Sequence, residues 1–246
     1  MSEGPAVEFR GVRKAFRDKA VLRGLDLRIS GGETFTILGG SGSGKSVCLK
    51  HMIGLLHCDA GQVSVFGRDV SRLAERDWVP LRRDFGMVFQ GAALFDSLSV
   101  FENVAYPIRE HRDWEEERVR ERVRRCLEGV GLAGSEALLP AELSGGMRKR
   151  VGVARAIALE PRIVLYDEPT TGLDPANSRR IGELITRLQA ELRSTSVVVT
   201  HDLELCFAIS DRVALLRDGR LAVEGSVDEV RAHAELRAFV EGENHG

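Results

Sequence analysis

The stretch that most restricts how this chain can fold is TFTILGGSGSGKSVCLK, residues 34–50. An apolar run is followed by a segment rich in glycine and serine, and then by VCLKHMIGLL, which has helical character. Residues 39–46, GGSGSGKS, satisfy the pattern G-x-x-x-x-G-K-[ST] in the strand-to-helix context that it requires. The alternative is a flexible glycine-serine linker or a tight turn, but a linker has no need of a strand, a lysine, a serine and a helix in that order. We therefore expect a phosphate-binding loop.

The residue types of this loop define its expected chemistry. Glycines let successive backbone N–H groups converge on one point, and the start of the following helix adds partial positive charge. Lys45 can reach the β- and γ-phosphates of a nucleoside triphosphate, and the Ser46 hydroxyl can ligate Mg²⁺. The residues expected to hold the nucleotide are Gly39, Gly40, Ser41, Gly42, Ser43, Gly44, Lys45, Ser46 and Val47.

Composition excludes several classes of function. The 246 residues include 37 acidic and 35 basic side chains, so no overall positive field exists to recruit nucleic acid, and no nucleic-acid partner is expected. Four cysteines lack the spacing of a metal site, and the opening MSEGPAVEFR is unlike a secretory leader, which favours a cytosolic protein. No apolar run approaches the roughly 20 residues that cross a bilayer. A role at a membrane would therefore require another chain that spans it.

Strand-like and helix-like runs alternate along much of the chain, which predicts an α/β domain with a largely parallel sheet. Residues 92–158 break the rhythm, because they contain helix signals and no convincing strand. One of these signals is WEEERVRERVRRCLEGVGL, whose apolar residues fall on one helical face: Val119, Val123, Cys126, Leu127 and Val130. We expect a single domain over residues 1–246, with a catalytic α/β core in approximately 1–91 and 159–246 and a helical subdomain in approximately 92–158.

A second chemical motif lies at RIVLYDE, residues 162–168. An apolar strand ends in two acids, and ligands of open α/β sheets lie at the carboxyl ends of strands. Asp167 is a candidate Mg²⁺ ligand, and Glu168 is a candidate general base that polarises the attacking water. A strand that merely ends in solvated acids is the alternative. The phosphate-binding loop elsewhere in the chain favours the chemical interpretation.

Two further segments contribute candidates that are ambiguous when taken alone. The apolar strand SVVVT ends at His201, which by itself has the bland interpretation of a surface or capping histidine. In ELSGGMRKRVGVARAIALEP, Ser144 is a good helix N-cap, and Gly145 with Gly146 leave the first N–H groups open to an anion. A capped amphipathic helix, with Val151, Ala154 and Ala158 facing a core, is the alternative there.

Together, in this order and spacing, these motifs resemble the nucleotide-binding subunits of ABC transporters over nearly the whole chain. The resemblance implies a P-loop NTPase fold with a RecA-like parallel sheet core, an antiparallel β subdomain and an inserted α-helical subdomain. It implies that Lys45, Gln90, Glu168 and His201 are catalytic, with Gln90 also near Mg²⁺. It also places Phe16 against adenine and Asp174 in the D-loop.

The same resemblance implies ATP and Mg²⁺ as cofactors and a head-to-tail homodimer. In that dimer, the phosphate-binding loop of one subunit and Ser144, Gly145 and Gly146 of the other enclose one ATP. Most members of the family have glutamine where this chain has Met147 in LSGGM, and threonine where it has Val47 after Ser46 of the phosphate-binding loop. The groups expected to touch phosphate are retained.

Finer details are similar to the ATPases of Mla/Mce phospholipid-transport systems, notably GGSGSGKSV, FGMVFQGAALFDSLSVFENVAYPIRE and LSGGMRKRVGVARAIALEP. This similarity implies an MlaE-type permease, an MCE-domain protein, a STAS-domain protein as a further partner, and a place on the cytoplasmic face of the inner membrane. An importer ATPase for a polar solute and a soluble ABC protein acting on ribosomes or DNA are the alternatives. The apolar cluster Ala92, Ala93, Leu94, Phe95, Leu98 and Phe101 is a candidate permease dock, with ordinary core packing as its alternative.

Overall fold

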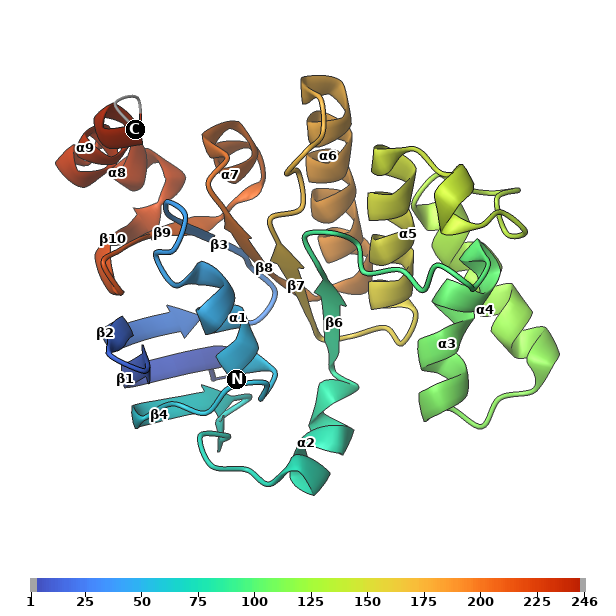
Figure 1. The fold of residues 1–246 in the computed structure, drawn as a ribbon, viewed down its shortest axis with the longest axis horizontal. Helices are drawn as coiled ribbons and strands as arrows, with labels where there is room; N and C mark the ends of the chain where they lie inside the picture. Colours follow the sequence, from blue (N-terminus) through green and yellow to red (C-terminus); the bar gives the residue numbers. More distant parts are fainter. Residues whose placement is uncertain (1–3, 244–246) are drawn as a thin grey trace. The chain divides into compact units, whose positions relative to one another are not determined.

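The computed structural model describes residues 4–243, so residues 1–3 and 244–246 of the expected domain lie outside the described part. The chain forms two compact units: unit 1 comprises residues up to Pro80 and from Thr195 onward, and unit 2 comprises Leu81–Ser194. Figure 1 shows the elements of both units, coloured along the chain.

Unit 1 contains two sheets. The first has the order β2-β1-β4-β5, its strands pair antiparallel, and it comprises β1 (Val7–Phe16), β2 (Lys19–Ile29), β4 (Ala60–Val65) and β5 (Arg68–Asp69). In the second, the order is β10-β9-β3-β8, with β3 parallel to both neighbours and β10 antiparallel to β9. Its strands are β3 (Thr34–Leu38), β8 (Thr195–Thr200), β9 (Arg212–Arg217) and β10 (Arg220–Ser226). β3 and β8 are buried along their whole length, as expected for strands covered on both faces.

Three helices of unit 1 follow strands, and the fourth follows the third. They are α1 (Lys45–Met52), α7 (Leu203–Ile209), α8 (Val227–Ala232) and α9 (Ala234–Glu243), while α2 (Glu75–Arg82) runs across the boundary into unit 2. Leu38 and Leu215 on the sheet pack with Cys206, Val230 and Leu236 from α7, α8 and α9. This core holds the C-terminal helices beside the strands that carry the phosphate-binding loop (Figure 1).

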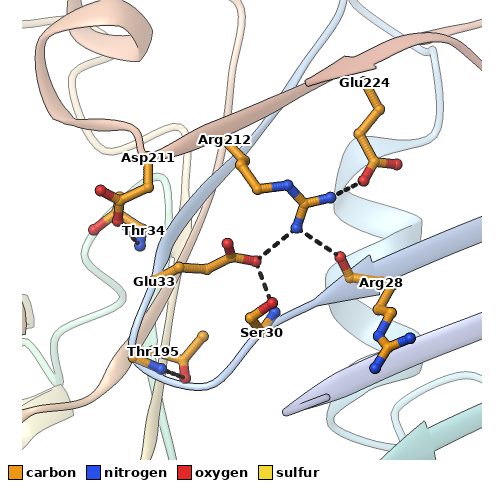
Figure 2. Close-up of polar contacts among 9 residues, drawn as sticks. Arg28, Ser30, Glu33, Thr34, Thr195, Asp211, Arg212 and Glu224 are labelled. Atoms are coloured by element: carbon orange, nitrogen blue, oxygen red, sulfur yellow. Dashed lines mark hydrogen bonds and ion pairs between the residues drawn. The ribbon is translucent and has the colours of Figure 1, made fainter. Parts of the chain in front are cut away.

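Polar contacts fix the start of β3, the strand that leads into the loop (Figure 2). The backbone N–H of Thr34 donates to Asp211 at 2.8 Å, and Glu33 accepts from Arg212 at 3.0 Å. Arg212 also pairs with Glu224 on β10. Burial raises the pKa of the Glu224 carboxyl, and the Arg212 guanidinium offsets part of that effect. These contacts attach the β2–β3 turn to β9 and β10 of the same unit.

Unit 2 contains two parallel strands and a set of helices. Its strands are β6 (Phe85–Val88) and β7 (Ile163–Asp167), and its helices are α3 (Val100–His111), α4 (Glu116–Gly129), the 3₁₀ turn η1 (Pro140–Glu142), α5 (Gly145–Ile157) and α6 (Pro175–Leu192). Between residues 92 and 158, all of which are described, there are helices and no strand. The apolar face predicted for residues 119–130 is buried in α4 and at its C-terminal end. Among residues 4–243, no helix combines the length and apolar character needed to span a bilayer.

Candidate functional site

The phosphate-binding loop lies between β3 and α1 of unit 1, where the sequence predicted it. Gly44 caps α1 with φ of 110°, a conformation that side-chain-bearing residues rarely adopt. A Cβ on Gly39 would lie 2.5 Å from the carbonyl oxygen of Leu216, so only glycine fits there. These two positions explain physically why the loop requires glycine at its beginning and end.

Lys45 lies against the loop that precedes it. Its side chain is 6% exposed, and its Nζ donates to the carbonyl oxygens of Gly39 at 2.5 Å and Gly40 at 3.0 Å. The Ser43 hydroxyl oxygen is buried and has no hydrogen-bond partner among the described residues. Beside the loop lies a cavity of about 330 Å³ lined by Gly40 to Ser43 together with the cationic Lys19, Arg23 and Arg217. A buried unpartnered hydroxyl, an ammonium and nearby cations fit a polyphosphate.

The register of the unit 1 sheet brings His201 to the loop. Leu38, the last residue of β3, pairs with Thr200, and the N–H of Gly39 donates to the Thr200 carbonyl at 3.3 Å. His201 is exposed and follows directly, while Asp202 caps α7 by accepting from the N–H of Leu205 at 3.0 Å. The capping role therefore belongs to Asp202. His201 stays a candidate γ-phosphate contact.

Phe16 ends β1 in the same unit. Its ring is 43% exposed, and the Lys14 Nζ lies 5.6 Å from the ring centroid. An exposed aromatic face at a strand end can stack on a planar base. Its adenine contact stays a prediction.

Unit 2 holds the candidate general base and the candidate glutamine together. β6 and β7 are parallel, with Val88 opposite Tyr166, so Gln90 and Glu168 leave the sheet at the same end. The Lys149 Nζ donates to the backbone carbonyls of both residues, at 3.3 Å for Glu168. The sequence predicted an amphipathic helix at this position. Because lysine is rarely buried, the pattern did not single out Lys149 as a site residue. No signal in one sequence marked it.

Glu168 has an unusual backbone. Its φ is 48°, in the left-handed region that costs energy for any residue with a side chain, and its side chain is 9% exposed. The Thr171 hydroxyl donates to its Oε2 at 3.4 Å. Asp167, at the end of β7, is half-buried beside it. Strain of this kind at a predicted catalytic carboxylate is consistent with a functional position.

The segment LSGGM forms the start of α5. Ser144 is the N-cap, as predicted, and its hydroxyl accepts from the Met147 N–H at 3.3 Å. Ser144 and Gly145 are exposed, so the free N–H groups of the first turn face outward. Figure 1 shows α5 beside α6, and a Cβ on Gly146 would lie 3.2 Å from the Asn177 side chain.

Asp174 is the N-cap of α6. It accepts from the Asn177 N–H at 2.9 Å and from the Asn177 side-chain amide at 2.5 Å. These hydrogen bonds lower the pKa of the Asp174 carboxyl, so it is ionised at neutral pH. The start of α6 therefore carries a fixed negative charge near the LSGGM segment.

Comparison with known proteins identifies the class. A family model described as ABC transporter matches residues 22–171, and the chain belongs to this family. It is an ATPase with the ABC fold, and the predicted parallel sheet, antiparallel sheet and helical insertion are confirmed.

Several members of the family are similar to this chain over most of its length. The chain is 41% identical to the intermembrane phospholipid transport system ATP-binding protein MlaF of Haemophilus influenzae, over 93% of this chain and 88% of that protein. It is 37% identical to the probable ribonucleotide transport ATP-binding protein mkl of Mycobacterium leprae, covering 100% and 72%. It is 44% identical to the methionine import ATP-binding protein MetN of Leifsonia xyli, covering 95% and 70%.

Solved structures agree on the fold. The structure of cbiO1 from Clostridium perfringens, described as part of the ABC transporter complex cbiONQ, has a TM-score of 0.87 and 30% identity over 95% of this chain and 93% of that chain. A dimeric cassette, MJ0796, described as bound to ADP and Pi after hydrolysis, has a TM-score of 0.83 and 33% identity over 90% and 98%.

His51, on α1 behind the loop, makes the stability of the chain depend on pH. Its Nδ1 lies 2.7 Å from the Val47 carbonyl, its ring packs on Phe9, and its Nε2 is buried with no described partner. Burial lowers the pKa of this imidazole. Below about pH 6.5 the unfolded chain therefore binds a proton at His51 that the folded chain does not bind. We expect the free energy of unfolding to fall with decreasing pH, by up to about 1.4 kcal/mol per unit.

The measurement is urea unfolding between pH 5 and 7.5 for wild type, His51→Leu and His57→Leu. His57 is exposed and serves as the control. His51→Leu should reduce the slope of the free energy of unfolding against pH by the contribution of one proton, whereas His57→Leu should leave that slope unchanged. A His51→Leu variant with the wild-type slope would contradict the assignment.

Proposed function

We propose that this chain is the ATP-hydrolysing subunit of a transporter that moves phospholipid between membranes through a separate permease. The observation that carries the proposal is the 41% identity to MlaF over nearly the whole chain. The LSGGM segment and the residues after Gln90 are consistent with it. An importer of a polar solute is the second candidate, favoured by the 44% identity to MetN.

In the proposed reaction, two copies of the chain bind head to tail, and the solved structures of the similar MJ0796 cassette are described as dimeric. Lys45 and His201 of one copy contact the phosphates, and Ser144, Gly145 and Gly146 of the other copy contact the same nucleotide. Glu168 orients and deprotonates the attacking water. Mg²⁺, when bound by Ser46, Asp167 and Gln90, would neutralise phosphate charge.

A groove in unit 2 fits the permease contact. A cavity of about 340 Å³ is lined by exposed aromatics, with Phe95 43% and Tyr106 46% exposed and their ring centroids 5.0 Å apart. Phe89 and the Arg155 guanidinium also line it. Of the apolar cluster expected to dock a permease, Ala92 is buried, so it belongs to the core, while Phe95 faces the groove. We infer that a cytoplasmic helix of the permease binds here, which would place the chain on the cytoplasmic face of the inner membrane.

The test is to tag the full chain in its native host, extract membranes gently and identify co-purifying proteins and lipids. We expect a polytopic permease of the MlaE type, an MCE-domain protein and bound phospholipid, and a small STAS-domain protein would extend the complex. A different permease with a solute receptor would keep the ATPase and replace the lipid by a polar solute. Ribosomes or DNA without membrane protein would overturn the transporter proposal.

A paired variant sharpens this test. Phe95→Glu places a charge in the groove and should release the permease, whereas Leu55→Glu changes an exposed leucine of unit 1 and should not. Both variants should bind ATP as the wild type does, because neither residue belongs to the phosphate-binding loop.

A further inference from the structure

A buried lysine joins two segments of unit 2. Lys149 is on α5, its side chain is 7% exposed, and its ammonium donates to the backbone carbonyls of Gln90 and Glu168. Burying an ammonium is costly unless its donors are satisfied, and two of its three N–H groups have these carbonyls as partners. Burial lowers the pKa of Lys149, while the nearby Glu168 and Asp167 carboxylates raise it. Because burying the ammonium costs free energy, we attribute the lysine at this position to its contacts with these two carbonyls.

Both segments held by Lys149 have strained backbones. Glu168 has φ of 48°, and after Gln90 the consecutive residues Ala92 and Ala93 have φ of 62° and 49°. Residues with side chains rarely adopt these angles, and they persist only where surrounding contacts hold them. At Glu168 the lysine bonds the carbonyl of the strained residue itself. The backbone angle at Glu168 also sets the direction in which its carboxylate leaves the chain.

One face of α5 holds the loop after Gln90. Arg155 donates to the carbonyls of Ala92 and Ala93, both at 2.8 Å, and a Cβ on Gly152 would lie 3.3 Å from the Ala92 side chain. Residues 149, 152 and 155 recur every three positions, so they lie along one side of the helix. Within this face, Lys149 is the residue that also bonds Glu168.

We propose that Lys149 is a positioning residue for ATP hydrolysis, fixing the backbone of Glu168 and tying it to the loop of Gln90. The carboxylate then takes its working direction only when the loop is in place. Because the groove proposed for the permease is lined by Ala93 and Arg155, a shift of that loop would reach Glu168 through one ammonium group. The kinetic part of this inference rests on the proposed role of Glu168.

The first test uses the purified full-length chain. Lys149→Met keeps the length of the side chain and removes the ammonium, Lys149→Arg keeps a charged donor, and Arg150→Met is the matched control on the neighbouring residue. We expect Lys149→Met to lower kcat for MgATP roughly 10- to 100-fold with KM and calorimetric Kd within about twofold, because displaced catalytic groups reduce turnover more than binding. Lys149→Arg should recover part of the rate, and Arg150→Met should remain near wild type.

A second measurement does not depend on activity. Hydrogen exchange on the same variants should show faster exchange for peptides covering residues 88–94 and 167–173 in Lys149→Met, with α3 unchanged. Wild-type exchange in both peptides, or a wild-type kcat, would overturn the proposal. A drop in melting temperature with α3 also exposed would show a merely structural role.

The two proposals fail in different ways. If the wild type neither binds nor hydrolyses ATP, the proposed function fails, while the exchange result still decides whether Lys149 holds both segments. If Lys149→Met slows turnover but Glu168→Gln does not, the lysine matters and the target carboxylate is wrong.

Discussion

Replacing Glu168 by glutamine is expected to abolish ATP hydrolysis while preserving ATP binding. Glutamine has the same shape but cannot accept a proton from water, and a general base of this kind contributes a factor of about 100 to 10,000. The Thr171 hydroxyl can still donate to the amide oxygen, so the buried side chain should keep its place. With ATP bound and not consumed, the variant should accumulate as a dimer.

Steady-state phosphate release and size-exclusion chromatography with MgATP measure the two effects. Glu160→Gln is a matched control, because Glu160 also has a positive φ, of 56°, but is exposed and pairs with Arg122 at 3.0 Å. That variant should hydrolyse ATP normally and show no nucleotide-dependent dimer. Hydrolysis by Glu168→Gln at the wild-type rate would remove Glu168 from the catalytic role.

Much of the fold follows from local patterns. The loop at residues 39–46 could be predicted because strand, glycines, lysine, serine and helix occur in one short segment whose chemistry allows few alternatives. β7 and β8 were predictable because buried parallel strands appear as continuous apolar runs. The helical character of residues 92–158 followed from periodicity and the absence of strand-like runs.

Other elements could not be read from periodicity. β1 and β2 did not appear in the alternating pattern, and only the family resemblance implied an antiparallel sheet. Their pairing has register shifts between Phe9 and Val12 and between Lys14 and Ala15, which interrupt the inward and outward alternation. A strand with bulges and many exposed residues lacks the signal that a regular one gives.

The contacts around Lys149 were missed for a different reason. Val151, Ala154 and Ala158 were expected on the buried face of this helix, and all three are buried. A lysine or arginine is ordinarily placed on the opposite face. The burial of Lys149 depends on carbonyls at Gln90 and Glu168, which are far away in sequence, so only the folded chain brings the donor and its acceptors together.

Replacing Lys45 by alanine is expected to weaken ATP binding strongly. Its ammonium lies at the centre of the loop, held by the Gly39 and Gly40 carbonyls, where it can turn to a phosphate without reorganising the backbone. Loss of a charge-assisted contact in such a site costs about 3 kcal/mol, or roughly 100-fold in Kd.

Isothermal titration of the full chain with MgATP measures this change. Lys50→Ala is the matched control, because it removes an exposed lysine from the same helix and should leave the affinity unchanged. The loss of affinity should exceed any loss of folding stability, because the Lys45 ammonium would pair with phosphate charge only in the nucleotide complex. Unchanged affinity in Lys45→Ala would count directly against the loop as the phosphate cradle, even if the variant hydrolysed ATP slowly.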